Sequence, residues 1–156
     1  MADDTSMADD QPLAEQPLDS AIDWVADHTK RYVASGGEDG HIWRGYPCLV
    51  LTTRGRRSGK FRRNALIYGR DGSDYLIVGS KGGNDHHPLW YLNLVDEPGV
   101  TVQVGAEVFD ATARVLSAEE KQRVWPSLVE LFPPYAEYQA KTQRDIPVVA
   151  LQRRAG

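Results

Sequence analysis

The chain of 156 residues has a single cysteine, Cys48, which excludes an intrachain disulfide and any metal site built from several thiolates. No uninterrupted apolar run is longer than four residues, whereas a helix needs roughly 20 apolar residues to span a bilayer. The first ten residues contain four aspartates where a signal peptide would carry basic residues and then an apolar run. We therefore expect a cytoplasmic protein without a transmembrane helix.

The common catalytic motifs are also lacking. The segment from Gly55 to Lys60 resembles a P-loop, but only three residues separate its glycines and no Ser or Thr follows the lysine. No Gly-x-Gly-x-x-Gly sequence indicates a Rossmann nucleotide site, and no nucleophile elbow surrounds Ser80. His86 and His87 are adjacent, which does not favour a shared metal ion, and we predict none.

The charges, in contrast, are strongly segregated. The net charge is −4, and the composition of 41% hydrophobic and 26% charged residues is typical of one soluble domain. Residues 1–40 hold ten acidic and two basic residues, whereas residues 41–70 hold eight basic residues and no acidic one. Such a basic segment in an acidic protein indicates a polyanionic partner, or neutralisation by the acidic N-terminal region.

The pattern of apolar residues predicts one domain with a short tail. Residues 1–17 are polar and rich in Asp, Gln and Pro, so we expect a disordered acidic tail. Apolar positions at helical spacing predict an N-terminal helix over 18–36 that ends at Gly36 and Gly37. Residues 18–156 then form the single folded domain.

Beyond the helix, alternating apolar residues and turn signals predict mostly antiparallel strands. We expect strands over 48–53, 61–69, 75–78, 100–104, 107–116 and 146–151, the first three forming a meander with a turn at Asp71-Gly72. Short helices are predicted over 87–93 and 135–142, and a capping box at Ser117 and Glu120 predicts a helix through Leu131, kinked or interrupted at Pro126. The predicted fold class is α+β: a six-stranded antiparallel split β-barrel with peripheral helices.

Two segments have the composition of anion-binding sites. Arg56, Arg57 and Ser58 lie at a turn, and Arg62 and Asn64 share one face of the following strand. The glycines of 80–83 would let backbone amides approach a ligand closely. From the pattern alone, it is equally plausible that these segments bind no ligand and are a solvated basic hairpin and an ordinary flexible loop.

Six separated motifs resemble the deazaflavin-dependent nitroreductase family, in order and in spacing, from Pro47 to Leu151. They are Leu51-Thr-Thr-Arg-Gly-Arg-Arg-Ser-Gly59, Ser80-Lys-Gly-Gly83, Pro88-Leu-Trp-Tyr-Leu-Asn-Leu94, Trp125-Pro126, Tyr135-x-x-Tyr138-Gln139 and Ile146-Pro147-Val148-Val149. The resemblance implies a split β-barrel oxidoreductase that binds coenzyme F420, an 8-hydroxy-5-deazaflavin with a phosphodiester and polyglutamate tail. This tail would explain the basic segment without a nucleic-acid partner.

The resemblance also implies a set of coenzyme contacts. Arginine and lysine side chains would hold the anionic tail, whereas Ala65, Leu66, Trp90 and the backbone of the second strand would line the flat ring. The predicted coenzyme-binding residues are Arg56, Arg57, Ser58, Arg62, Arg63, Asn64, Ala65, Leu66, Ile67, Val78, Gly79, Ser80, Lys81, Leu89, Trp90, Tyr91, Leu92, Asn93 and Tyr135.

In such an enzyme the coenzyme donates hydride and the protein supplies orientation and electrostatics, which agrees with the missing triad and metal site. Tyr135, expected in a surface segment, and Ser80 are the predicted catalytic residues, as hydrogen-bond donors near the ring and the acceptor. The family's acceptors are quinones, and some members reduce nitroimidazoles. Phe132 replaces a tyrosine of nitroreducing members, Ala65 a proline and Arg57 a lysine. The acidic N-terminus favours at most weak association with the inner face of the membrane.

Three alternatives remain open at this point. A split-barrel reductase that uses flavin mononucleotide would have the same fold but would need fewer arginines for its single phosphate. A nucleic-acid-binding module would use the basic hairpin, although the overall charge is negative. A carrier that binds the coenzyme without turnover would have the same binding residues. The sequence does not define the oligomeric state.

Overall fold

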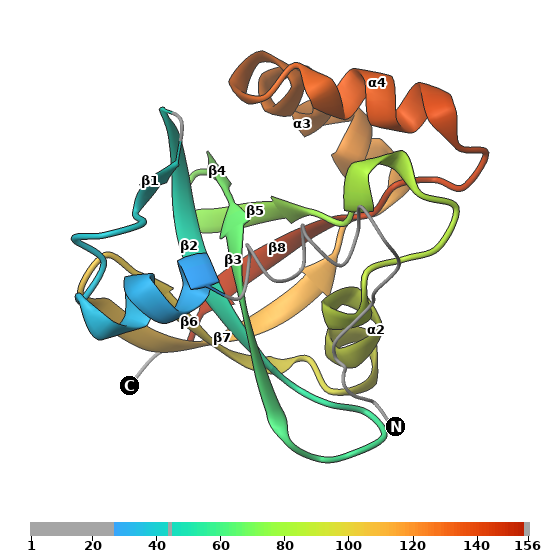
Figure 1. Ribbon diagram of the computed structural model, residues 1–156. Helices are drawn as coiled ribbons and strands as arrows, with labels where there is room; N and C mark the ends of the chain where they lie inside the picture. The colour runs from blue at the N-terminus through green and yellow to red at the C-terminus, as the bar shows by residue number, and fades with distance from the viewer. Residues whose placement is uncertain (1–26, 44, 155–156) are drawn as a thin grey trace.

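The computed structural model describes residues 27–43 and 45–154; the predicted tail over 1–17 lies outside them. The described residues form one curled antiparallel sheet with helices around it (Figure 1). Its strands are β1 (Ile42–Trp43), β2 (Tyr46–Arg54), β3 (Phe61–Ile67), β4 (Gly69–Asp71), β5 (Asp74–Val78), β6 (Gly99–Val104), β7 (Glu107–Val115) and β8 (Val148–Arg153). The connections contain the 3-10 turn η1 (Lys81–Gly83) and the helices α2 (Leu89–Asp96), α3 (Ala118–Leu131) and α4 (Pro134–Lys141).

The strand order shows how the barrel is split. It runs β1-β2-β6-β7-β8-β5-β4, and β3 pairs with the other edge of β2. The chain passes from β3 to β4 at Tyr68, whose N–H donates to the carbonyl of Pro47 (3.2 Å). β3 pairs with β2 and β4 pairs with β5, and among the described strands no ladder joins β3 to β4, so the barrel is open between them. The predicted α+β split barrel is confirmed.

The predicted number of six strands and the predicted meander are wrong in detail. The expected strand over 61–69 breaks at Tyr68 into β3 and β4, so its first part cannot pair with β5. The two-residue strand β1 was not expected, since it is too short to show a period. The turn at Asp71-Gly72 is confirmed: Asp71 pairs with Asp74 across Gly72 and Ser73, and Gly72 has φ +61°.

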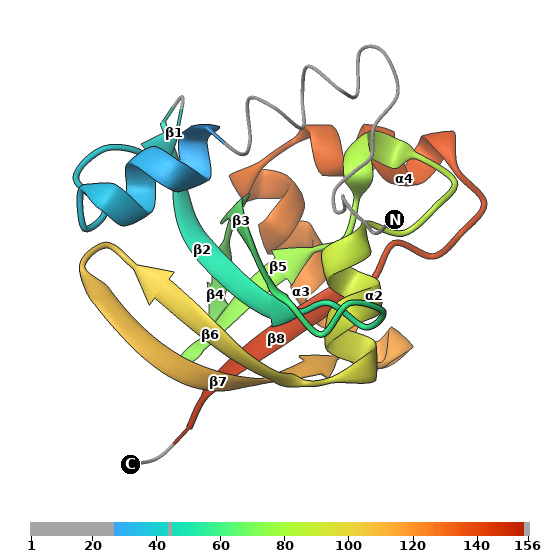
Figure 2. The same cartoon turned by 60° about the horizontal axis from the view of Figure 1, so that its bottom comes forward.

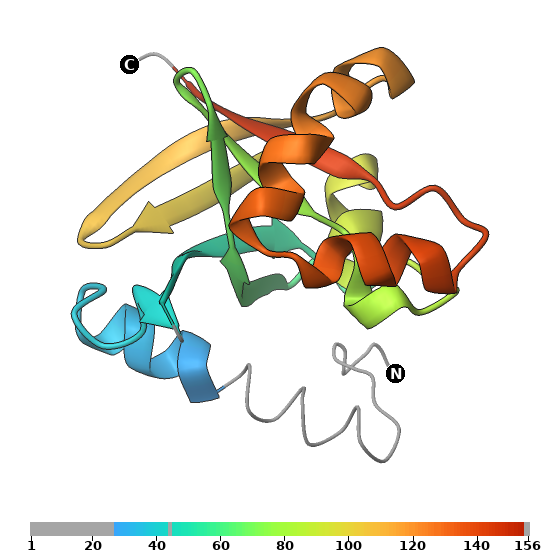
Figure 3. The same ribbon diagram turned by 90° about the horizontal axis from the view of Figure 1, so that it is seen from above.

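Two apolar clusters lie on opposite faces of the sheet. The barrel interior holds Leu49, Leu51, Ile77, Trp90, Leu94, Val100, Val102, Phe109, Ala111, Ala113, Val149 and Leu151. The outer face of β5 and β8 packs against α3 and α4 through Leu76, Val78, Val124, Leu128, Tyr135, Ile146, Val148 and Ala150. Figures 2 and 3 show α3 and α4 together on one side of the sheet, with α2 near the end of the barrel.

The helices begin and end close to the predicted residues. Ser117 and Glu120 form the expected capping box, with the Glu120 N–H donating to Ser117 Oγ at 3.2 Å and the Ser117 N–H to Glu120 Oε1 at 2.9 Å. Of the two outcomes expected at Pro126, a kink or an interruption, the interruption does not occur, because α3 continues through this residue. Strand β8 begins at Val148 rather than at residue 146, because Ile146 and Pro147 complete the loop from α4.

The N-terminal helix packs on the outer face of β2 and β3. Residues 27–34 are helical and the helix ends before Gly36 and Gly37 as expected, whereas the predicted first part, before residue 27, lies outside the described residues. Tyr32 is fully buried against Cys48, Val50 and Ala65. Its hydroxyl accepts the N–H of Gly105 (2.7 Å) and donates to the Cys48 carbonyl (3.0 Å), which ties the helix to the barrel.

Candidate active site

A tight, exposed loop joins β2 to β3, and we call residues 54–60 the basic hairpin loop. The Gly55 N–H donates to the Lys60 carbonyl (2.7 Å), and the Gly59 N–H donates to the Gly55 carbonyl (2.8 Å). Gly59 has φ +73°, which a residue with a side chain adopts at a cost. Ser58 Oγ accepts the Lys60 N–H (3.1 Å), so this hydroxyl helps to shape the turn.

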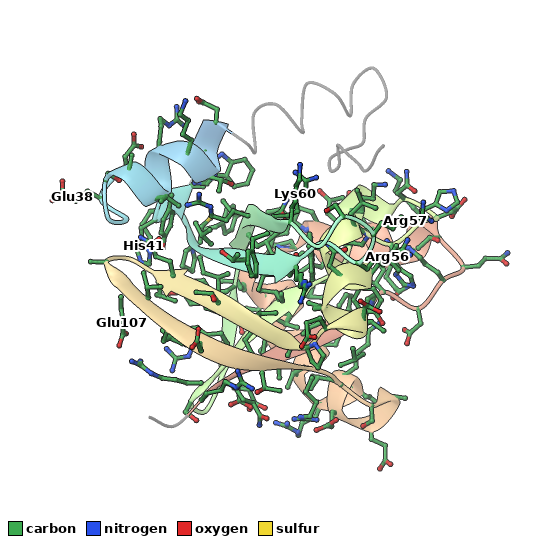
Figure 4. The ribbon with its side chains drawn as sticks, turned by 90° about the horizontal axis from the view of Figure 1, so that it is seen from below. Glu38, His41, Arg56, Arg57, Lys60 and Glu107 are labelled. Carbon is green, nitrogen blue, oxygen red and sulfur yellow. The ribbon has the colours of Figure 1, made fainter. Side chains whose placement is uncertain are left out.

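Three cations of the basic hairpin loop have no acidic partner among residues 27–43 and 45–154. Arg56, Arg57 and Lys60 are exposed, and none forms an ion pair with an acidic residue in the described part of the chain. Other surface arginines do: Arg123 pairs with Asp71 at 2.8 Å and Arg153 with Glu107 at 2.6 Å. Figure 4 shows Arg56, Arg57 and Lys60 at one end of β2, with Glu38, His41 and Glu107 toward the other end. Uncompensated cations on one loop make a suitable site for a polyanion.

Asn93 attaches the basic hairpin loop to α2. Its Oδ1 accepts the backbone N–H of Arg56 (3.1 Å), and its Nδ2 donates to Thr53 Oγ1 (3.2 Å). Asn93 is only 7% exposed and Thr53 only 1%. The resemblance implies a coenzyme contact at Asn93, but the structure has both polar ends of this side chain engaged within the protein.

Strand β3 carries polar residues on one face. Because side chains alternate along a strand, Arg62 and Asn64 share the face of Leu66, which packs against the barrel interior. Arg63 shares the opposite face with Ala65 and Ile67, which pack with Tyr32 under the N-terminal helix. The predicted common face of Arg62 and Asn64 is confirmed, and Arg63 belongs to the other face.

The free edge of β3 is partly covered by the N-terminal helix. The Ala65 N–H donates to Thr29 Oγ1 (2.9 Å), so it points away from β2. Hydrogen-bonding directions alternate along an antiparallel strand, so the amides of Arg63 and Ile67 point to the same edge. This edge could accept the ring of a coenzyme, but the Ala65 side chain is buried and its amide is already bonded.

The loop from β5 to α2, residues 79–87, is held from outside by Arg144. Nη1 donates to the Gly79 carbonyl (3.0 Å), Nη2 to the Ser80 carbonyl (2.8 Å) and Nε to the Asn84 carbonyl (2.7 Å). Nη1 also lies 3.1 Å from His87 Nδ1. Lys81, Gly82 and Gly83 follow with φ of +46°, +62° and +82°, a sharp turn for which the glycines are suited.

The pKa of His87 depends on its burial and on this contact. Burial and then the charge of Arg144 lower the pKa of His87, so the ring stays neutral near pH 7. Because Arg144 can only donate, His87 Nδ1 is the acceptor and the ring proton is on Nε2. The ring also packs on Tyr91, with centroids 4.6 Å apart.

The predicted contacts from β5 and α2 differ in their accessibility. Val78 is 8% exposed, and Gly79 uses its N–H toward the Pro147 carbonyl (2.9 Å) and its carbonyl toward Arg144. Trp90 is 7% exposed in the barrel interior, so its ring belongs to the core. Three other predicted contacts of α2, Leu89, Tyr91 and Leu92, are exposed or half-buried.

Tyr135 is buried, and the prediction of a surface segment is wrong. It is 5% exposed in the cluster of α3, α4, β5 and β8, and Phe132 packs edge-on against it at 4.9 Å. The two prolines at 133 and 134 do break the chain, but they direct it into α4, whose inner face covers the sheet. Burial raises the pKa of Tyr135 above its usual value, with smaller contributions from Cys48 and Tyr138.

The Tyr135 hydroxyl has no hydrogen-bond partner among the described residues. A buried hydroxyl without a partner costs about 1–3 kcal/mol, so it is a candidate donor to a bound ligand. Phe132, which packs against Tyr135, also packs edge-on against Tyr46, so the Tyr135 ring lies close to the first residue of β2. Ser80 is half-exposed beside η1.

The sequence analysis did not predict a role for Arg144 or Thr29 at the site. Arg144 follows the last predicted helix outside every motif, and Thr29 occupies an apolar position of the helical pattern. No local signal marks either residue, because each acts on a segment more than 30 positions away. Within the described residues, no group of His, Cys, Asp and Glu could hold a metal ion, and no helix is long and apolar enough to cross a membrane.

Comparison with known proteins identifies the class of this chain. A solved F420-H2 dependent reductase is 45% identical, with a TM-score of 0.64 over 72% of this chain and 98% of that one. A structure described as a domain-swapped dimer is 43% identical, with a TM-score of 0.66 over 85% of this chain and 99% of that one. These neighbours place the chain among split-barrel reductases that depend on coenzyme F420.

The family is defined more narrowly by the sequence relatives. The family model of the F420H(2)-dependent quinone reductases matches residues 24–153. An F420H(2)-dependent quinone reductase of Mycobacterium tuberculosis is 40% identical over 131 residues, which cover 81% of this chain and 88% of the relative. The chain belongs to the F420H(2)-dependent quinone reductase family, and it is an enzyme that uses reduced coenzyme F420.

The described residues fit this coenzyme. Its polyanionic tail requires several cations, and the basic hairpin loop presents Arg56, Arg57 and Lys60 without described acidic partners. Its flat ring requires hydrogen-bond donors beside an apolar surface, and the amides of Arg63 and Ile67 at the edge of β3 and the N–H of Ser80 are the candidates. A site for flavin mononucleotide would need fewer cations, because that coenzyme carries a single phosphate.

Proposed function

We propose that this enzyme reduces quinones with hydride from reduced coenzyme F420, and that its site lies between the basic hairpin loop, the edge of β3, the loop 79–87 and Tyr135. The observation that carries the proposal is the group of exposed cations on the basic hairpin loop, which Asn93 fixes against α2. Quinone is the acceptor in the printed name of the 40% identical relative.

In the proposed site, some residues bind the coenzyme tail and others orient the coenzyme ring and the acceptor. Charge-assisted hydrogen bonds would hold the phosphodiester and the carboxylates of the tail, with Arg56, Arg57, Arg62 and Lys81 as the donors. Amides at the edge of β3 would position the ring from the side. When bound, the reduced deazaflavin supplies a hydride, and the protein then has to place the acceptor and provide for the second proton.

Tyr135 would orient the acceptor as a hydrogen-bond donor. Burial raises the pKa of its hydroxyl, so the proton remains on Tyr135 at neutral pH and is available to a quinone oxygen. The raised pKa also makes the phenol a weak acid, which does not readily transfer its proton completely. We therefore assign to Tyr135 the stabilisation of the developing negative charge on the quinone oxygen, while the proton that completes the hydroquinone comes from water.

Replacing Tyr135 by Phe tests this role. We expect turnover with a quinone to fall about tenfold, which corresponds to about 1.4 kcal/mol of transition-state stabilisation. The dissociation constant of the coenzyme should stay the same, and the midpoint of thermal unfolding should stay or rise, since the lost hydroxyl has no described partner. Tyr138→Phe on the same helix is the matched control. Unchanged turnover in Tyr135→Phe would remove this residue from the chemistry.

Nitro compounds are the second class of acceptor that the resemblance implies. Phe132 is half-buried between Tyr46 and Tyr135, with both ring centroids 4.9 Å away, so it offers an aromatic wall without a hydroxyl. We expect steady-state assays with reduced coenzyme F420 to show faster reduction of a naphthoquinone than of a bicyclic nitroimidazole. A preference for the nitroimidazole would contradict the proposed acceptor class.

A further inference from the structure

The Arg144 side chain, outside the predicted site, forms a dense set of hydrogen bonds with described residues. Its guanidinium donates to three backbone carbonyls of one loop, those of Gly79, Ser80 and Asn84, at 2.7–3.0 Å. The planar fork of arginine suits such a set of acceptors, whereas a lysine ammonium would reach them one at a time. The contacts span 60 to 65 positions of sequence, so they join two otherwise separate segments.

The segment around Arg144 is itself rigidly held. Gln139 Nε2 donates to the Arg144 carbonyl (2.8 Å), and Gln139 Oε1 accepts the Ile146 N–H (3.0 Å). Thr142 Oγ1 donates to Asp85 Oδ1 (2.8 Å), a second bond between this segment and the loop. These bonds hold the backbone around Arg144 in place, so the Arg144 side chain can fix the conformation of the loop 79–87.

The carbonyl contacts determine where the amides of the loop point. In a trans peptide, the C=O of one residue and the N–H of the next point in opposite directions. Because the Gly79 and Ser80 carbonyls face Arg144, the N–H groups of Ser80 and Lys81 face away from it. The Ser80 N–H has no acceptor among the described residues.

We propose that Arg144 is a positioning residue, which turns the peptide planes at Ser80 so that the Ser80 N–H donates to an oxygen of coenzyme F420. This inference rests on the proposed function, because it assigns the loop 79–87 to the coenzyme site. Arg144 acts through the loop and does not touch the coenzyme, so its geometry matters more than its charge.

The first test measures the loop without any coenzyme. In hydrogen–deuterium exchange of the unliganded protein, we expect Arg144→Lys to raise the exchange rate of peptides covering 80–87 by at least threefold. Arg153→Lys is the matched control, because Arg153 lies at the far end of β8 and pairs with Glu107 there. Unchanged exchange in Arg144→Lys would overturn the proposal, whatever the protein binds.

The second test separates geometry from charge. Titration with oxidised coenzyme F420, followed by the coenzyme's own fluorescence, should give a dissociation constant at least tenfold higher for both Arg144→Lys and Arg144→Ala. Millimolar ethylguanidinium should restore binding to Arg144→Ala at least threefold, and the salt dependence should match that of the wild type. Wild-type affinity in Arg144→Lys would overturn the proposal. If the wild-type protein itself does not bind the coenzyme, the proposed function fails instead.

Discussion

At the scale of single residues, the most informative side chains are polar groups that are buried or partly buried. Asn93 and Arg144 form hydrogen bonds to the two loops of the proposed site, whereas the Tyr135 hydroxyl has no described partner. Buried polar groups are normally hydrogen-bonded within the protein. Asn93 and Arg144 therefore shape the proposed site, whereas Tyr135 is available to donate a hydrogen bond to a ligand.

Replacing Asn93 by Ala should weaken both folding and coenzyme binding. The Arg56 N–H and the buried Thr53 hydroxyl would each lose a partner, and we expect the free energy of unfolding to fall by about 2 kcal/mol. Urea denaturation measures this loss. Val95→Ala, an exposed position of α2 outside the predicted coenzyme contacts, is the control for coenzyme affinity. If Asn93→Ala binds the coenzyme as tightly as the wild type, the attachment of the basic hairpin loop is irrelevant to the site.

His87 should make stability depend on pH in the acidic range. Its pKa is lowered in the folded state from a reference value of 6.5, so below that pH the unfolded chain binds the proton more readily. Stability from the neutral ring is therefore present above pH 6.5 and is lost as the pH falls. Thermal unfolding from pH 7.5 to 5 should show a smaller loss in His87→Asn than in the wild type. The exposed neighbour variant His86→Asn should keep the wild-type profile; parallel profiles for all three proteins would refute this role.

At the scale of elements, the structure follows the sequence wherever local chemistry decides. The capping box at Ser117, the turn at Gly72 and the helix end at Gly36 each depend on residues close in sequence, and each is confirmed. The break at Tyr68 was missed because it depends on a non-local contact with Pro47. Burial of Tyr135 was missed because it depends on the packing of α4 over β5 and β8, which no local pattern shows.

The capping box gives a prediction for α3. Ser117→Ala removes the acceptor for the Glu120 N–H, and we expect the free energy of unfolding to fall by about 1 kcal/mol. Ser127→Ala, in the interior of the same helix, should change stability much less, since its Oγ bonds only to the Val124 carbonyl within the helix. Chemical denaturation compares the two variants. Equal losses would mean that the cap contributes nothing specific.

The candidate site could be predicted in part at this scale. The basic hairpin loop and the glycine-rich turn were visible in the sequence because charge and glycine content are local properties. The resemblance to a known family linked them to one ligand. Their attachment through Asn93 and Arg144 could not be predicted, because hydrogen bonds across 37 and 64 positions depend on the finished fold.

At the scale of the whole molecule, the separation of charge is the dominant feature. Residues 1–17 contain five acidic residues and no basic one, in a chain whose residues 41–70 carry eight positive charges. These opposite charges attract one another and compete with an anionic ligand, most strongly at low ionic strength. Deleting residues 1–17 should therefore tighten coenzyme binding at low salt and have little effect at moderate salt. Equal affinities for the two proteins at low salt would exclude this competition.

The most direct measurement is a fluorescence titration of the full-length protein with oxidised coenzyme F420 and, separately, with flavin mononucleotide, each at low and moderate salt. We predict saturable binding of coenzyme F420 that weakens as salt rises, because in the proposed site the cations of the basic hairpin loop hold the anionic tail. Flavin mononucleotide, with a single phosphate, should bind much more weakly. Binding of flavin mononucleotide in preference to coenzyme F420, or of neither ligand, would contradict the assignment of this site.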